Sequence, residues 1–150
     1  MKKHLIKRAA GVVGAATVMT LVPLAGTSYA ATCSGTGCTN KGPVATGCDA
    51  GATTKKSTGD SYRYAELRWS ATCTAGWVRV VTKDSPWGPD YATIEAWNKN
   101  TWDLTKSLSV SAVSNGSDWS NMIGGAGYAY RVCYKNAWDN TLSCSGYWYS

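Results

Sequence analysis

Residues 62–69, Tyr-Arg-Tyr-Ala-Glu-Leu-Arg-Trp, alternate along the chain between two kinds of side chain. The even-numbered positions are aromatic or charged, and positions 65, 67 and 69 are apolar. Successive side chains of an extended strand point to opposite faces, so this period of two predicts a half-buried strand with a largely polar outer face.

The same alternation returns at intervals to the end of the chain. The further predicted strands span residues 77–83, 91–98, 107–112, 118–123, 128–134 and 142–149. Short strands at this spacing, separated by turn signals, are typical of an antiparallel β-sandwich or a small barrel. We therefore expect a small all-β protein with one domain and no persuasive helix.

Two of the predicted hairpins are local. Residues 62–69 and 77–83 are separated by a short turn and are expected to pair. The dipeptide Asn115-Gly116 is the tight-turn signal between residues 107–112 and 118–123, and it gives the strongest hairpin prediction in the chain.

The first 30 residues are predicted to be a secretory signal peptide that is removed. A basic start is followed by an apolar stretch at residues 9–24, and the small residues Ser28 and Ala30 place cleavage after Ala30. The apolar run is shorter than the roughly 20 residues that a membrane-spanning helix needs, so we expect no membrane span after cleavage. Residues 31–60 are expected to form a loop-rich, Cys-containing segment packed on the sheet, and residues 61–150 the antiparallel β region of the same domain.

The remaining chain contains an even set of six cysteines, which in an exported protein indicates a disulfide framework. They are Cys33, Cys38, Cys48, Cys73, Cys133 and Cys144. The last two fall on the predicted terminal hairpin, and we expect them to pair with each other. Among the first four, Cys33 is expected to pair with either Cys38 or Cys48. Whichever of these two remains is expected to pair with Cys73. A Cys-only zinc site is the weaker alternative, because the spacings do not repeat as C-x₂-C knuckles.

Composition excludes several classes of function. The only histidine, His4, lies in the leader, so the mature chain has no Ser-His-Asp triad, no Cys-His pair and no His-ligated zinc. Without the four basic residues of the leader, eleven basic residues face nine acidic ones, a net charge of +2. These basic residues are scattered, which disfavours a nucleic-acid partner. We expect a binding protein, monomeric and without a cofactor or metal.

A motif in the first half of the mature chain resembles a known family. It consists of Cys38-x-x-Lys41-x-Pro43-x-x-x-Gly47-Cys48-Asp49-Ala50 with Thr53 and Thr54, then Glu66-Leu67-Arg68-Trp69-Ser70-x-x-Cys73 and Trp77-x-Arg79. It is similar to the small exported bacterial family known only as domain of unknown function 2690. The resemblance implies an exported, β-rich domain of Gram-positive, chiefly actinobacterial, type with no assigned activity. The chain departs from the usual family pattern at Gly42, where Asp is more frequent.

Most charged residues have a structural explanation. Glu66, Arg68 and Arg79 occupy alternate positions of neighbouring predicted strands, where opposite charges can pair across the sheet. Asp84 and Asp90 are the best candidate carboxylate pair for glycoside chemistry or calcium, but loops contain Asp by default.

The aromatic residues are the stronger indication of function. The chain has eight Trp and nine Tyr but no Phe, and all except Tyr29 follow the leader. Tyr and Trp combine an apolar face with a hydrogen-bonding edge, which suits a sugar-stacking platform or a protein interface. We expect Trp69 and Trp77 to fill the core. The candidate binding residues are Trp87, Tyr91, Trp102, Trp119 and Trp138.

Two hypotheses follow from this composition. In the first, a secreted, noncatalytic protein binds cell-wall or other polysaccharide through exposed Trp and Tyr. In the second, it binds an extracellular protein, as an inhibitor or antimicrobial effector does, through a loop that disulfides hold in place.

Overall fold

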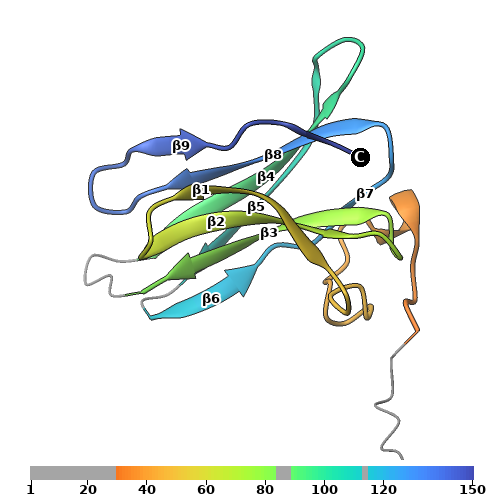
Figure 1. Ribbon diagram of the computed structural model, residues 1–150, viewed down its shortest axis with the longest axis horizontal. Coiled ribbons are helices and arrows are strands. Elements are labelled where there is room, and N and C mark those ends of the chain that lie inside the picture. Colours follow the sequence, from red (N-terminus) through yellow and green to blue (C-terminus); the bar gives the residue numbers. More distant parts are fainter. Residues whose placement is uncertain (1–29, 84–88, 113–114) are drawn as a thin grey trace, which may run out of the picture.

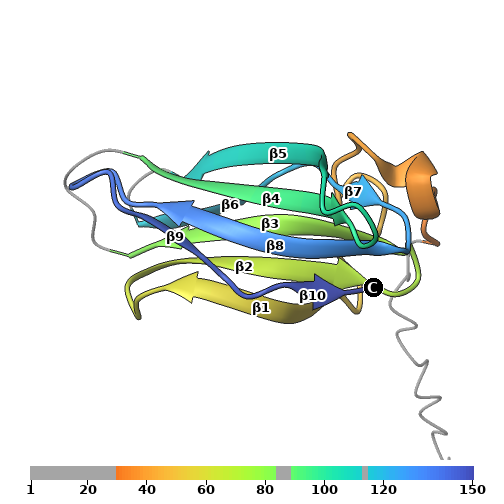
Figure 2. The same ribbon diagram turned by 90° about the horizontal axis from the view of Figure 1, so that it is seen from above.

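The computed structural model describes residues 30–83, 89–112 and 115–150, which form two antiparallel sheets packed face to face. In Figure 1, β8 and β4 lie above β2 and β3, and the view from above in Figure 2 shows that the strands of both sheets run in nearly the same direction. This is an aligned β-sandwich, one of the two predicted architectures. The helical structure among the described residues is a single 3₁₀ turn, η1 (Gly35–Cys38).

The first sheet contains four strands in the order β1-β2-β3-β6. They are β1 (Thr53–Gly59), β2 (Arg63–Ser70), β3 (Ala75–Thr82) and β6 (Gly116–Trp119), and the short β7 (Ile123–Gly124) also pairs with β3. The predicted hairpin of residues 62–69 and 77–83 is confirmed, because β2 and β3 pair from Arg63 opposite Thr82 to Ser70 opposite Ala75.

The second sheet has the order β10-β8-β4-β5. Its strands are β4 (Asp90–Asn98), β5 (Leu104–Ala112), β8 (Tyr128–Lys135) and β10 (Trp148–Tyr149), with β9 (Leu142–Cys144) beside β8. The two sheets also contact each other at one edge, where the hydroxyls of Thr58 on β1 and Ser143 on β9 lie 2.7 Å apart.

The core lies between the two sheets and follows the predicted alternation. Positions 65, 67 and 69 of β2 are buried, while positions 64, 66 and 68 are partly exposed. Leu67, Val78 and Val80 of the first sheet join Ile94 and Val132 of the second in one buried cluster. Trp69 lies in the same cluster, as expected, with its ring 5.4 Å from that of Tyr130.

Three predictions about the strands are wrong. Residues 142–149, predicted as one strand, form the two short strands β9 and β10. Thr53–Gly59, expected in the loop-rich segment, forms strand β1, because an edge strand paired on one side tolerates a polar sequence with little burial. The predicted hairpin of residues 107–112 and 118–123 is absent. β5 pairs with β4, and β6 pairs with β3 in the other sheet, so the turn at Asn115 carries the chain between sheets.

The N-terminal segment up to Ala52 packs at one end of the sandwich, where it is drawn in orange in Figures 1 and 2. Backbone hydrogen bonds fasten it: Gly35 donates to Cys73 in the β2–β3 turn, and Asn40 donates to Met122. It covers a second buried cluster that includes Trp77, Met122 and Ala75. In the part of the chain that the structure describes, no helix is long and apolar enough to span a membrane.

Candidate functional site

An open groove lies on the outer face of the first sheet, beside the loop of residues 41–49. Its volume is about 250 Å³. The sheet contributes Arg68, Trp77, Arg79, Ser117 and Trp119, and the loop contributes Pro43, Val44 and Asp49. Ligand pockets commonly measure roughly 300–1,000 Å³, so this groove suits one ring-sized group of a longer ligand rather than a whole large molecule.

One row of the groove crosses three neighbouring strands. Arg79 of β3 lies opposite Glu66 of β2 on one side and opposite Trp119 of β6 on the other. The Arg79 Nε donates to Oε2 of Glu66 at 2.8 Å, and its Nη2 lies 2.8 Å from the same oxygen. Among the described residues, none accepts a hydrogen bond from the Arg79 Nη1. The ion pair fixes the guanidinium and leaves that donor available to a ligand.

A second row holds Arg68 beside Trp77. The Arg68 Nη1 donates to Oγ1 of Thr54 at 2.7 Å, and its Nη2 donates to the carbonyl oxygen of Ala52 at 2.8 Å. These contacts orient a cation without neutralising it. Trp77 points to the outer face and is nonetheless only 3% exposed, because the N-terminal segment covers it.

The loop that forms the rim is held from within. The Thr46 hydroxyl donates to the carbonyl oxygen of Gly42 at 2.9 Å, and the Cys48 amide donates to the carbonyl oxygen of Pro43 at 2.8 Å. Asp49 follows directly and is exposed, with no hydrogen bond or ion pair from its carboxylate to another described residue. The groove therefore offers oriented donors from Arg68 and Arg79 and an acceptor from Asp49.

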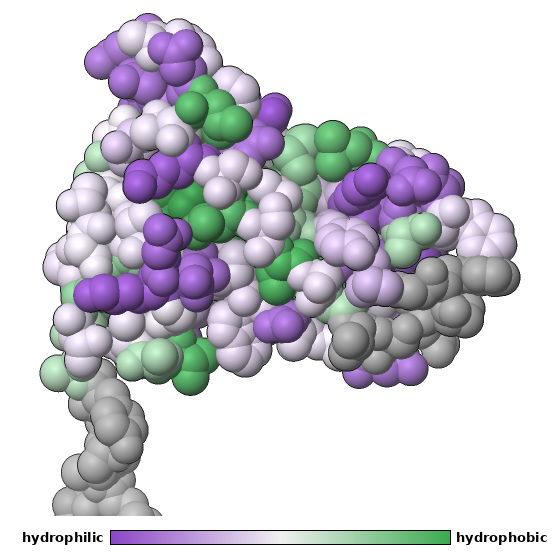
Figure 3. Space-filling model, turned by 180° about the vertical axis from the view of Figure 1, so that it is seen from behind, coloured by the Kyte–Doolittle hydropathy of each residue, from purple (hydrophilic) through white to green (hydrophobic). Residues whose placement is uncertain are grey.

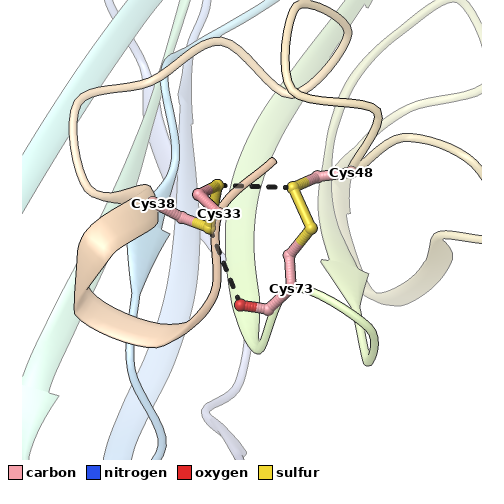
Figure 4. A group of neighbouring side chains, drawn as sticks. All are labelled: Cys33, Cys38, Cys48 and Cys73. Carbon is pink, nitrogen blue, oxygen red and sulfur yellow. Dashed lines mark hydrogen bonds between the residues drawn. A yellow bond between two sulfur atoms is a disulfide. The ribbon is translucent and has the colours of Figure 1, made fainter. Parts of the chain in front are cut away.

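Two disulfides support this rim and pack against each other, as Figure 4 shows. Cys33 is bonded to Cys38, and Cys48 to Cys73, which is one of the pairings that the sequence left open. The Sγ atoms of Cys33 and Cys48 are 3.7 Å apart, and all four sulfurs lie within 4.8 Å of one another. Four thiolates at this spacing would suit zinc, but here the sulfurs are paired as disulfides. The Cys48–Cys73 bond ties the loop to the β2–β3 turn.

The third disulfide joins Cys133 and Cys144, the pair predicted across the terminal hairpin. These two residues lie directly opposite each other on β8 and β9. Three disulfides indicate that the protein folds in an oxidising compartment.

The predicted aromatic candidates do not form one surface. Trp119 lies in the groove and is 42% exposed. Tyr91 is exposed at the start of β4 in the other sheet, and Trp138 is exposed in the turn after β8. Trp102 is exposed in the hairpin after β4, at the opposite end of that strand from Tyr91. Trp87 lies outside the described residues.

The candidate carboxylate pair has no support as a site. Asp84 lies outside the described residues, and Asp90 is fully buried. The Asp90 carboxylate accepts a hydrogen bond from the Thr82 hydroxyl at 2.8 Å and one from the amide of Ala137 at 3.2 Å. These contacts give Asp90 a structural role at the end of β4.

Sequence reasoning missed most of the groove. It assigned Glu66 and Arg79 to structural pairing, and the ion pair is present, but it gave no role to Asp49 or Ser117. The available signal was the family motif itself. Five residues of that motif line the groove although they come from three separate segments: Pro43, Asp49, Arg68, Trp77 and Arg79.

A family model described as "Protein of unknown function (DUF2690)" matches residues 36–132, about two thirds of the chain. The matched range includes every residue that lines the groove. No curated protein and no solved structure matches the chain.

Proposed function

Since the chain belongs to the DUF2690 family of proteins of unknown function, we propose a function from its groove: the protein is a secreted, noncatalytic binding protein that holds cell-surface polysaccharide. The observation that carries the proposal is the position of Trp119. This residue is 42% exposed, lies directly opposite Arg79 in register and lines the same groove as Arg68 and Asp49.

This set of groups matches the surface of a sugar ring. The apolar C–H face of a sugar packs against an indole, while the hydroxyls need donors and acceptors at its edge. Arg68 and Arg79 supply planar donors that other contacts already orient, so binding immobilises few new rotamers. Asp49 and Ser117 supply oxygen atoms on the rim.

The charges of the groove favour a neutral saccharide over an acidic one. Glu66 neutralises Arg79 through their ion pair, and the charge of Asp49 balances that of Arg68. A site for an acidic polymer would be expected to carry an excess of cations, as sites for phosphate polymers do. Binding in the groove should therefore depend little on ionic strength.

The face of the protein seen in Figure 3 gives less support to a large protein partner. Figure 3 shows the face on which β5 and β6 lie, where hydrophobic residues form small patches separated by hydrophilic and intermediate ones. A stable protein interface commonly has a contiguous apolar centre. Export to an oxidising compartment, which the three disulfides support, would bring the groove into contact with wall polysaccharide.

The test combines tryptophan fluorescence with sedimentation. Purified residues 31–150 are titrated with soluble peptidoglycan fragments and neutral oligosaccharides, and are co-sedimented with insoluble peptidoglycan. We expect saturable quenching, with a binding affinity that changes little between about 0.05 and 0.5 M salt. The Trp119→Ala variant should bind at least about tenfold more weakly, a loss of roughly 1.4 kcal/mol, with an unchanged melting temperature.

Tyr91→Ala is the matched control, because Tyr91 is similarly exposed on the other sheet and touches no part of the groove. It should bind like the wild type. If no glycan changes the fluorescence or sediments the protein, the polysaccharide proposal fails and a protein partner becomes the leading hypothesis.

A further inference from the structure

The outer face of the second sheet carries a cluster that repeats the arrangement of the groove. Glu95 of β4 lies opposite Arg131 of β8, and the Arg131 Nε donates to Oε2 of Glu95 at 2.6 Å. Tyr147, just before β10, places its ring centroid 5.2 Å from the Arg131 guanidinium. Both faces thus carry a glutamate–arginine ion pair across neighbouring strands, with an aromatic residue next to the arginine.

The rings of this cluster are held firmly. The Trp97 Nε1 donates to Oε2 of Glu95 at 2.8 Å, and the Arg131 guanidinium lies 5.1 Å from the Trp97 ring centroid. One guanidinium therefore contacts both Trp97 and Tyr147, which fixes the two rings relative to each other through cation–π interactions. Trp102 adds a third ring, whose centroid is 5.2 Å from that of Tyr147.

Trp102 occupies a position that its residue type disfavours. Its φ is 58°, in the left-handed region that Gly and Asn adopt more readily than a bulky residue. Burial does not offset this cost, because Trp102 is 48% exposed. Hydrogen bonds nevertheless hold the turn: the Asn98 carboxamide oxygen accepts from the amides of Asn100 and Thr101. A strained and exposed Trp on a hydrogen-bonded turn indicates a role for the ring itself.

The hairpin that carries Trp102 extends beyond the strands of the sandwich, while the Trp102 ring itself stays beside Tyr147. The hairpin projects from the end of the sandwich in Figures 1 and 3. The Glu95–Arg131 ion pair at the centre of the cluster has no net charge, which again matches a neutral ligand. The same class of ligand therefore suits both faces.

We infer that Trp97, Trp102 and Tyr147, set around the Glu95–Arg131 ion pair, form a second polysaccharide site. The inference rests on the proposed function of the groove. The two sites face opposite directions on sheets that lie about 10 Å apart, so one extended glycan cannot fill both without turning around the edge of the protein. The protein is then bivalent and links two glycan strands, which raises its avidity for a wall of many strands.

The test separates binding from cross-linking. Long, soluble peptidoglycan strands are mixed with residues 31–150 over a range of ratios, and light scattering reports the cross-linked complexes. The wild type should give a maximum at an intermediate ratio, because excess protein occupies each strand separately. Co-sedimentation with insoluble peptidoglycan measures binding in parallel.

Trp102→Asn is the informative variant, since Asn accepts the left-handed conformation and the variant should fold at least as stably as the wild type. It should lose the scattering maximum, while its apparent affinity for insoluble peptidoglycan falls at least about tenfold through lost avidity. Trp119→Ala should behave in the same way, and the double variant should no longer sediment. Tyr91→Ala, on the same sheet but at the other end of β4, should match the wild type.

The outcomes distinguish the two proposals. If the wild type binds no glycan, the proposed function fails and this inference fails with it. If the wild type binds and Trp119→Ala alone abolishes binding, while Trp102→Asn scatters like the wild type, the groove stands and the second site is refuted. The remaining control is the sedimentation of the protein alone, without glycan, which reports its oligomeric state. A wild-type dimer that Trp102→Asn converts to a monomer would show that the cluster binds a second copy of the protein instead.

Discussion

Arg79 and Glu66 face each other on neighbouring strands, and both Nε and Nη2 of the arginine lie 2.8 Å from one carboxylate oxygen of the glutamate. The pair is partly exposed, so its contribution to folding should be small, on the order of 0.2–1 kcal/mol. Its main effect is to hold the Arg79 guanidinium in the groove beside Trp119.

Replacing this carboxylate should therefore affect binding more than stability. Glu66→Ala frees the Arg79 side chain, and we expect glycan affinity to fall severalfold while the free energy of unfolding changes by less than about 1 kcal/mol. Glu66→Gln keeps an oxygen that can accept from Arg79 and should retain most of the affinity. Urea denaturation and fluorescence titration measure the two quantities. An unchanged affinity in Glu66→Ala would show that the orientation of Arg79 is unimportant.

The disulfides should differ in their effect on the groove. The Cys48–Cys73 bond closes a loop of 25 residues and anchors the rim. The chain-entropy relation gives roughly 3.5 kcal/mol for that loop. The Cys133–Cys144 bond closes 11 residues on the other sheet, for which the same relation gives roughly 2.8 kcal/mol. We expect the Cys48→Ala/Cys73→Ala variant to lose glycan binding even where it remains folded.

The matched control is Cys133→Ala/Cys144→Ala, which should be less stable than the wild type but should keep the affinity of the groove. Thermal unfolding gives the stability, and titration well below both melting temperatures gives the affinity. Comparable affinities for the two double variants would mean that the rim does not depend on its disulfide.

Sequence reasoning predicted the elements that have an alternating pattern. β2, β3, β4 and β8 each place apolar side chains at every second position, and all four lie at the centre of a sheet. β1 could not be found in this way, because its side chains Thr53–Lys55 are exposed and its pairing depends on a neighbouring strand. The pairing of β6 was missed for a related reason: a tight turn marks a change of direction without specifying the sheet that the next strand joins.

The candidate site shows the same limit. The exposed Trp119 could be selected from its residue type and its turn-adjacent position. Its partners could not, because Asp49, Arg68 and Arg79 come together only when the loop after Pro43 packs over β2 and β3. Local pattern indicated which side chains were unusual, and the tertiary fold determined which of them meet.

Gly124 offers a test of how the N-terminal segment is seated. It is buried in β7, and a Cβ at this position would overlap the carbonyl oxygen of Gly35 in the 3₁₀ turn. Because backbone rather than a flexible side chain occupies the space, Gly124→Ala should cost about 1–3 kcal/mol of stability. Gly37→Ala, where a Cβ meets nothing within 4 Å, is the control and should be nearly neutral. A stable Gly124→Ala variant would show that η1 can move away from β7.

The buried phenol of Tyr130 should make the stability of the fold depend on pH in the alkaline range. The Tyr130 side chain is fully buried, and its hydroxyl donates to the carbonyl oxygen of Gly125 at 2.6 Å. Burial, with a smaller contribution from the charge of Tyr128, raises the pKa of Tyr130 above its usual range, and burial also raises the pKa of Tyr134. Both phenols therefore ionise more readily in the unfolded chain.

A raised pKa in the folded state stabilises the fold fully below the unfolded pKa near 10, and this contribution is lost as the pH rises above that value. The free energy of unfolding should therefore fall above about pH 10, by at most roughly 1.4 kcal/mol per pH unit for each tyrosine. Tyr130→Phe should be less stable at neutral pH, because the Gly125 carbonyl loses its donor, yet its stability should fall less steeply with pH. Rapid urea unfolding at several pH values measures both effects. Tyr149→Phe, which removes an exposed hydroxyl, is the control, and parallel slopes for Tyr130→Phe and the wild type would contradict the assignment to Tyr130.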